Sequence, residues 1–201
     1  LGIDSKSQRG TAQLVKIVAK FGESKISPKK TLLPRALRAI VVGIPNVGKS
    51  SLINSLVKKN MARTGDKPGV TKGKQWIRVL PNLELLDTPG LLWPKFESAQ
   101  VGFNLAVTGA INNQVFDLTE VATKFLDLMK TDYPAKLLAK YNLTSFKEEN
   151  LELLKELGSK RGFLQSGGTV DLEKTALALL RDFRSGKLGR ITLEKPLDII
   201  K

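Results

Sequence analysis

The feature that most constrains this chain is the run Gly43-Ile44-Pro45-Asn46-Val47-Gly48-Lys49-Ser50, which fits the phosphate-binding pattern G-x-x-x-x-G-K-[ST]. The apolar, partly β-branched segment 37–42 before it predicts a buried strand, and residues 51–57 after it predict a helix. Between a strand and a helix, the two glycines let successive backbone N–H groups converge on phosphate oxygens at the helix N-terminus. The chain is therefore predicted to bind a nucleoside triphosphate.

Individual side chains of this run have predicted roles. Lys49 is expected to reach the β- and γ-phosphates, and Ser50 to offer its hydroxyl to Mg²⁺. The predicted nucleotide-contacting residues of the loop are Asn46, Val47, Gly48, Lys49, Ser50 and Ser51.

Two downstream signals have the order that a nucleotide switch requires. A predicted strand over 83–86 delivers Asp87-Thr88-Pro89-Gly90, where Asp87 can support Mg²⁺ and the Gly90 N–H can meet the γ-phosphate. Segment 65–73, rich in turn formers, carries Thr71, which could complete the Mg²⁺ shell while the γ-phosphate is present. A threonine in such a segment is usually a turn residue, but its position between Ser50 and Asp87 favours the metal role. The residues expected to support catalysis are Lys49, Thr71 and Gly90.

The charge of the chain indicates a polyanionic partner. Lysine and arginine number 33 against 19 acidic residues, which gives a net charge of +14. Such a surface attracts phosphate backbones in a salt-dependent, sequence-tolerant way. A membrane could use the same charge, but no apolar stretch approaches the roughly 18 to 20 residues that span a bilayer, and no signal peptide is evident.

The absence of two residue types excludes whole classes of chemistry. The chain contains no Cys and no His, which rules out disulfides, thiolate zinc sites and serine–histidine hydrolases. A chain without disulfides suits a reducing cytoplasm, so we expect a cytoplasmic protein.

The motif order resembles the circularly permuted GTPases that assist ribosome assembly, most closely the ribosome biogenesis GTPase A family. The resemblance rests on 43–50, on Pro68-Gly69-Val70-Thr71 and on 87–96, and it continues through 160–168 and 181–190. Ordinary GTPases carry the guanine-reading motif N-K-x-D after D-x-x-G, whereas this chain contains no Asn-Lys pair. In the permuted family the guanine-reading segments come first, so N-K-x-D would lie before Leu1, and the chain is expected to lack its N-terminal part.

The resemblance also implies ligands and partners. Ile3-Asp4-Ser5-Lys6-Ser7 is similar to the second guanine-reading segment, with Ser5 and Lys6 at the guanine-contacting positions, although both could equally be solvated residues capping the next helix. The implied ligands are GTP or GDP with Mg²⁺. The implied partners are the large ribosomal subunit and its ribosomal RNA, which the family's C-terminal helical domain engages. A monomer without membrane attachment is expected.

Two positions bear on hydrolysis. Leu91 follows Gly90 where many GTPases carry a water-orienting Gln, and a leucine cannot position water by hydrogen bonding. Family members with this replacement are thought to recruit a histidine from near their N-terminus, and this chain has none, so slow intrinsic hydrolysis is expected without upstream sequence and a ribosomal partner. In similar GTPases an Asn at the position of Asn46 helps to place K⁺ beside the phosphates. Asn46 could instead simply tolerate an unusual loop conformation.

The predicted fold class is α/β: a circularly permuted P-loop GTPase domain over 1–112, followed by a small all-helical RNA-binding domain over 113–201. In the first, a helix over 11–21 precedes the phosphate loop, and strands over 76–79 and 83–86 are joined by a turn at Pro81-Asn82. In the second, Asp117 is the expected cap of one helix and Gly186 the expected end of another. The junction at 111–116 is the expected boundary.

Three classes of function remain open. The favoured one is a GTP-controlled switch that assists assembly of the large ribosomal subunit. The second is a P-loop phosphotransferase acting on a small molecule, which the Asp-Thr-Pro-Gly loop does not favour. The third is a purely structural RNA-binding protein with a vestigial nucleotide site. The presence of Lys49, Ser50 and Asp87 argues against this third class, because a vestigial site would be expected to lose such residues.

Overall fold

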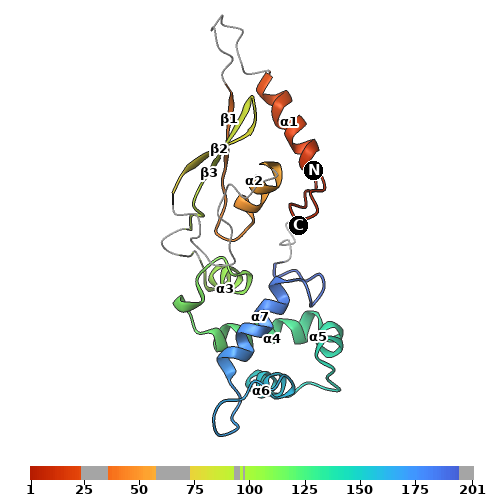
Figure 1. The fold of residues 1–201 in the computed structure, drawn as a ribbon. Coiled ribbons are helices and arrows are strands. Elements are labelled where there is room, and N and C mark those ends of the chain that lie inside the picture. Colours follow the sequence, from red (N-terminus) through yellow and green to blue (C-terminus); the bar gives the residue numbers. More distant parts are fainter. Residues whose placement is uncertain (24–35, 58–72, 93–95, 97, 195–201) are drawn as a thin grey trace, which may run out of the picture. The chain divides into compact units, whose positions relative to one another are not determined.

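The computed structural model describes residues 1–23, 36–57, 73–92, 96 and 98–194. It divides into two compact units, Leu1–Pro94 and Lys95–Lys201. The first unit contains α1 (Thr11–Glu23), β1 (Leu37–Val41), α2 (Lys49–Val57), β2 (Gln75–Leu80) and β3 (Leu83–Asp87) (Figure 1). All five elements were predicted at nearly these positions.

The sheet of the first unit has the strand order β1-β3-β2. Strand β1 runs parallel to β3, with Val41 opposite Asp87, and β2 pairs antiparallel to β3 through the predicted turn at Pro81-Asn82. Because parallel strands end at the same edge of a sheet, the loop that follows β1 and the carboxylate that ends β3 lie together. This topology positions the candidate site.

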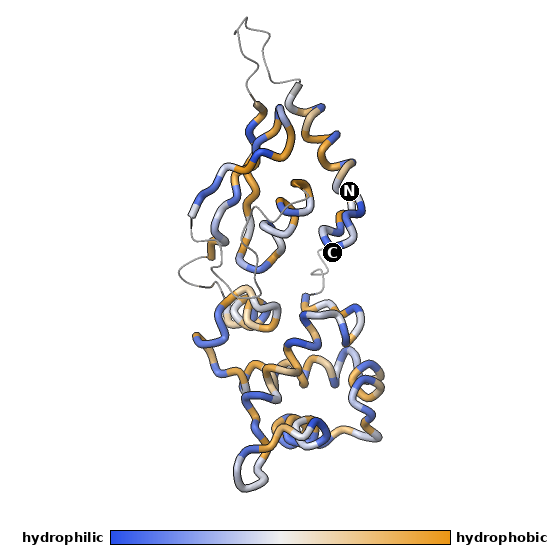
Figure 2. Tube along the Cα trace, viewed as in Figure 1, coloured by the Kyte–Doolittle hydropathy of each residue, from blue (hydrophilic) through white to orange (hydrophobic). Residues whose placement is uncertain are grey.

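One face of the sheet carries the core of this unit. Residues of β3 alternate between buried and partly buried, and Leu83 and Leu85 lie on the buried side. They pack with Ile53 of α2 and Ile77 of β2, while Val18 of α1 lies at the margin of this cluster. Figure 2 shows that hydrophobic and hydrophilic residues are mixed along the strands.

The second unit is helical, as predicted, and contains α3 (Ala99–Thr108), a 3₁₀ turn (Asn113–Val115), α4 (Leu118–Asp132), α5 (Pro134–Tyr141), α6 (Asn150–Lys160) and α7 (Leu172–Arg184). Helix α4 is central and packs against each of the other four α-helices. Phe125, Leu126 and Met129 of its apolar stripe are fully buried.

Local signals in this unit are confirmed. The Asp117 carboxylate accepts hydrogen bonds from the N–H groups of Thr119 (2.7 Å) and Glu120 (3.1 Å) and caps α4. After α7, Gly186 adopts φ +74°, and its N–H donates to the Phe183 carbonyl at 2.9 Å.

The division between the units differs from the expected junction at 111–116. It falls between Pro94 and Lys95, because α3 packs against α4 and α7 of the helical unit. The Arg184 guanidinium of α7 donates to the carbonyls of Ala106 (2.6 Å) and Val107 (2.8 Å) and thereby ties the end of α3 into the helical unit.

Candidate nucleotide-binding site

The phosphate loop connects β1 to α2 with an unusual backbone. Asn46 (φ +58°) and Gly48 (φ +94°) adopt left-handed conformations, which glycine adopts freely and asparagine tolerates. The loop conformation alone is therefore a sufficient reason for an asparagine at position 46. Val47 and Ser51 are exposed, so the outer side of the loop and the first turn of α2 face solvent.

Lys49 folds back over the loop that precedes it. Its ammonium group donates to the carbonyls of Gly43 (3.0 Å) and Ile44 (2.7 Å). Burial lowers the pKa of Lys49, and the negative charge of Asp87 opposes this shift. The cation is thus held inside the curve of the loop, at the N-terminus of α2.

Asp87 is the buried acidic residue in the described part of this unit. Its side chain is 1% exposed, and one carboxylate oxygen, Oδ2, accepts a hydrogen bond from the Ser50 hydroxyl at 3.0 Å. The other oxygen, Oδ1, is buried and has no hydrogen-bond partner among the described residues. A buried carboxylate oxygen without a partner carries a desolvation cost that a cation would offset. The Ser50 hydroxyl and the Asp87 carboxylate together offer the oxygen ligands that Mg²⁺ prefers.

Two contacts attach the segment after β3 to its surroundings, one to the end of β1 and one to the phosphate loop. The Thr88 hydroxyl donates to the Val41 carbonyl at the end of β1, at 2.7 Å. A Cβ atom on Gly90 would lie 2.5 Å from the Cα of Pro45, which leaves room only for glycine. Sequence analysis proposed Gly90 for its N–H group and missed this steric requirement, which depends on a contact across 45 residues of sequence.

Two further residues with predicted roles are Leu91 and Thr71. Leu91 is 77% exposed. Thr71 lies outside the described residues, as do the rest of 65–72 and the residues 93–95. The structure therefore brings together Lys49, Ser50, Asp87 and Gly90, and it leaves the role of Thr71 a prediction.

Ser5 and Lys6 lie in a tight turn held by Asp4. One Asp4 oxygen accepts from the N–H groups of Lys6 (2.8 Å) and Ser7 (3.3 Å), and the other accepts from the Ser7 hydroxyl (2.8 Å). These hydrogen bonds hold the pKa of Asp4 below its ordinary value, and the bond from the Ser7 hydroxyl has the largest effect. Sequence analysis missed Asp4, although an aspartate that opens a polar turn is a recognisable signal. The guanine-contacting role of Ser5 and Lys6 stays a prediction.

Within the described ranges, no helix combines the length and the apolar character needed to cross a bilayer.

Comparison with known proteins gives consistent matches. Residues 38–161 match the family described as "50S ribosome-binding GTPase". Over 198 residues the chain is 46% identical to "Ribosome biogenesis GTPase A" of Bacillus pumilus, covering 98% of this chain and 70% of that protein. The relative of the same name from Bacillus cereus is 53% identical over 167 residues, which cover 83% of this chain and only 56% of the relative. Among solved structures, the GDP-bound structure of TM YlqF is similar with a TM-score of 0.53 and 25% identity, over 96% of this chain and 79% of that one.

Proposed function

The chain belongs to the ribosome biogenesis GTPase A family of ribosome-binding GTPases, and on that premise we propose that it is a GTP-controlled switch that docks on the maturing large ribosomal subunit. The observation that carries the proposal is the convergence of Lys49, Ser50 and Asp87 at one edge of the sheet. The triphosphate state favours docking, and hydrolysis releases the protein.

The phosphate loop receives the triphosphate through backbone N–H groups and one cation. The N–H groups of 46–51 surround the phosphates at the start of α2, and Lys49 exchanges its two carbonyl partners for β- and γ-phosphate oxygens. The Gly90 N–H donates to the γ-phosphate. The close contact between Gly90 and Pro45 keeps this N–H near the phosphate loop. Ser5 and Lys6 contact the guanine base.

Ser50 and Asp87 would hold Mg²⁺, and Thr71 would complete its shell in the triphosphate state. The buried and unpartnered Oδ1 of Asp87 supports this assignment, because a cation would compensate the desolvation of that oxygen. When bound, Mg²⁺ neutralises charge on the β- and γ-phosphates. K⁺ beside Asn46 adds further positive charge, and equal GTPase activity in sodium and potassium would contradict this part of the proposal.

Hydrolysis by this chain alone is slow. Leu91, which is exposed and has no hydrogen-bonding side-chain group, occupies the position of the water-orienting residue. A ribosomal partner therefore supplies the missing interaction. Single-turnover kinetics with and without large subunits test this step, and fast turnover without subunits would contradict it.

The partner is ribosomal RNA of the large subunit, and the cell compartment is the cytoplasm. The net charge of +14 favours a polyanion, and the family's description as ribosome-binding supports RNA as that polyanion.

The decisive experiment compares the wild-type chain with Lys49→Ala. We expect GTP to compete against a fluorescent guanine nucleotide far better than ATP does, and Lys49→Ala to lose both nucleotide binding and nucleotide-dependent docking. A small-molecule phosphotransferase would show no dependence on ribosomal subunits. A passive RNA-binding protein would dock equally well with Lys49→Ala.

A further inference from the structure

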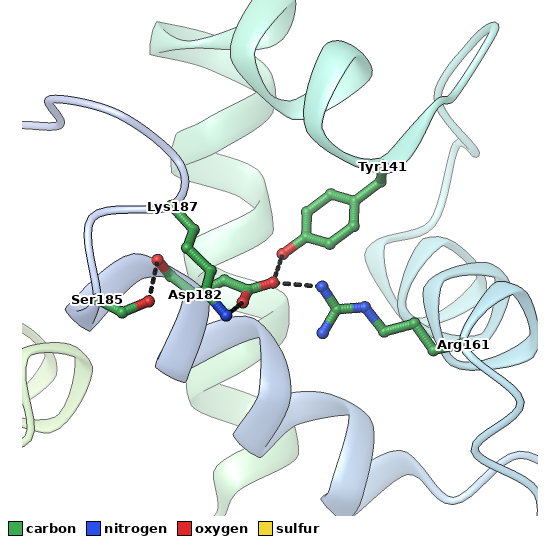
Figure 3. A network of polar contacts seen from close by, with 5 residues as sticks. All are labelled: Tyr141, Arg161, Asp182, Ser185 and Lys187. Atoms are coloured by element: carbon green, nitrogen blue, oxygen red, sulfur yellow. Dashed lines mark hydrogen bonds and ion pairs between the residues drawn. The ribbon is translucent and has the colours of Figure 1, made fainter.

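Among the described residues of the helical unit, the buried carboxylate is that of Asp182, near the end of α7. It is 5% exposed, and the ends of α5 and α6 supply its neighbours (Figure 3). Its Oδ2 accepts hydrogen bonds from the Tyr141 hydroxyl (3.1 Å) and from Arg161, while the Lys187 ammonium lies 3.7 Å from Oδ1. We call these four residues, Tyr141, Arg161, Asp182 and Lys187, the Asp182 cluster.

The Asp182 cluster carries more positive than negative charge. One carboxylate faces two cations, and the positive charge of nearby Lys140 also acts on it. Lys160, next to Arg161 in sequence, is not an additional unpaired cation, because its ammonium donates to the Asn142 carbonyl at 2.7 Å and pairs with the Glu156 carboxylate at 3.6 Å. The side chains of Arg161 and Lys187 are 28% and 63% exposed, so both cations reach the surface.

Stability alone is a weak reason for this arrangement. Ion pairs with an exposed partner, such as the 63% exposed Lys187 paired with Asp182, contribute little to stability, and buried pairs often contribute no more than an apolar replacement would. What the arrangement does provide is orientation. Arg161 is fixed from two directions, by Asp182 and by the Tyr141 ring, over which its guanidinium lies at 5.1 Å. A fixed guanidinium loses less entropy when it binds a phosphate.

We propose that the Asp182 cluster is a phosphate-binding site for an RNA backbone, in which Asp182 acts as a positioning residue that holds Arg161 and Lys187 toward the phosphates. The proposal rests on the ribosomal function proposed above, which selects RNA rather than a membrane as the polyanion.

The sharpest test is Asp182→Asn, because it separates positioning from net charge. This variant raises the net charge by one, so simple charge attraction predicts tighter RNA binding. Positioning predicts weaker binding, since Arg161 and Lys187 lose their common anchor. The measurement is the Kd of the full chain for isolated bacterial large subunits at several salt concentrations, with helix content followed by circular dichroism.

A second variant keeps the test valid if Asp182→Asn fails to fold. Lys187→Gln changes an exposed side chain, and Lys155→Gln is its matched control, because Lys155 is 44% exposed and pairs with Glu152 on α6. We expect Lys187→Gln to weaken binding about threefold to tenfold and to lower the salt-dependence slope by about one, with little change for Lys155→Gln.

Equal effects of the two lysine variants would overturn the proposal, as would unchanged or tighter binding by folded Asp182→Asn. The proposal would also be overturned if Lys187→Gln lost binding to anionic phospholipid vesicles while its binding to subunits was unchanged. If the wild-type chain itself failed to bind subunits in any nucleotide state, the proposed ribosomal function would fail first, and the two failures are thereby distinguishable.

Discussion

Gly90 and Pro45 approach so closely that a Cβ atom on Gly90 would lie 2.5 Å from both the backbone nitrogen and the Cα of Pro45. Gly90 follows β3, and Pro45 lies within the phosphate loop. The contact therefore joins the segment proposed to sense the γ-phosphate to the loop proposed to hold the phosphates. Neither backbone can yield without displacing its own loop.

Gly90→Ala is expected to uncouple γ-phosphate sensing from nucleotide binding. Losing one N–H bond to a charged phosphate corresponds to roughly a tenfold to hundredfold weaker affinity for a non-hydrolysable GTP analogue, with a smaller change for GDP. Titration calorimetry with both nucleotides measures this difference. Gly2→Ala is the control, because a Cβ there meets no atom within 4 Å and the position lies outside the phosphate loop and the two downstream switch segments. Equal affinities of Gly90→Ala and the wild type for the analogue would contradict the assignment.

Arg184→Met is expected to destabilise the helical unit by about 1 to 3 kcal/mol, because the carbonyls of Ala106 and Val107 at the end of α3 lose their donors. Urea unfolding followed by far-ultraviolet circular dichroism measures the change. The matched control is Arg181→Met on the same helix, which removes an exposed arginine whose charge lowers the pKa of Arg184. A similar loss in both variants would show that the carbonyl contacts are not the cause.

The Asp182 carboxylate predicts an acid-sensitive component of stability. Burial acts to raise its pKa, but the hydrogen bond and charge of Arg161, with Tyr141 and Lys140, outweigh it and hold the pKa below its ordinary value of 3.8. Since the folded-state pKa is the lower one, the stabilisation is present above pH 3.8 and is lost as the pH falls through the folded-state pKa. Thermal unfolding from neutral pH downward should show the wild type converging on Asp182→Asn. A constant difference would disprove the linkage.

Features that depend on neighbouring residues could be predicted from sequence. The phosphate loop, its strand and its helix are encoded within about twenty residues by hydrophobic pattern and glycine spacing. The cap at Asp117 and the glycine at 186 are likewise local, since each acts on a helix end that it adjoins. The Mg²⁺ roles assigned to Ser50 and Asp87 from their motifs implied that the two residues meet, and the parallel pairing of β1 and β3 in the structure brings them to one edge of the sheet.

Features that depend on distant contacts could not be predicted. The apolar pattern of α3 suits either unit, and only its packing with α4 and α7 places it in the second. Nothing local to Asp182 signals burial, because its partners come from the ends of two other helices. The steric need for Gly90 likewise depends on the position of Pro45, which no spacing rule specifies.

The most direct test of the switch is co-sedimentation of the chain with isolated bacterial large ribosomal subunits in the presence of a non-hydrolysable GTP analogue or of GDP. The account predicts co-sedimentation with the analogue and Mg²⁺, its loss with GDP, and its loss in both states for Lys49→Ala. Equal co-sedimentation in the two nucleotide states would contradict the claim that the γ-phosphate controls docking.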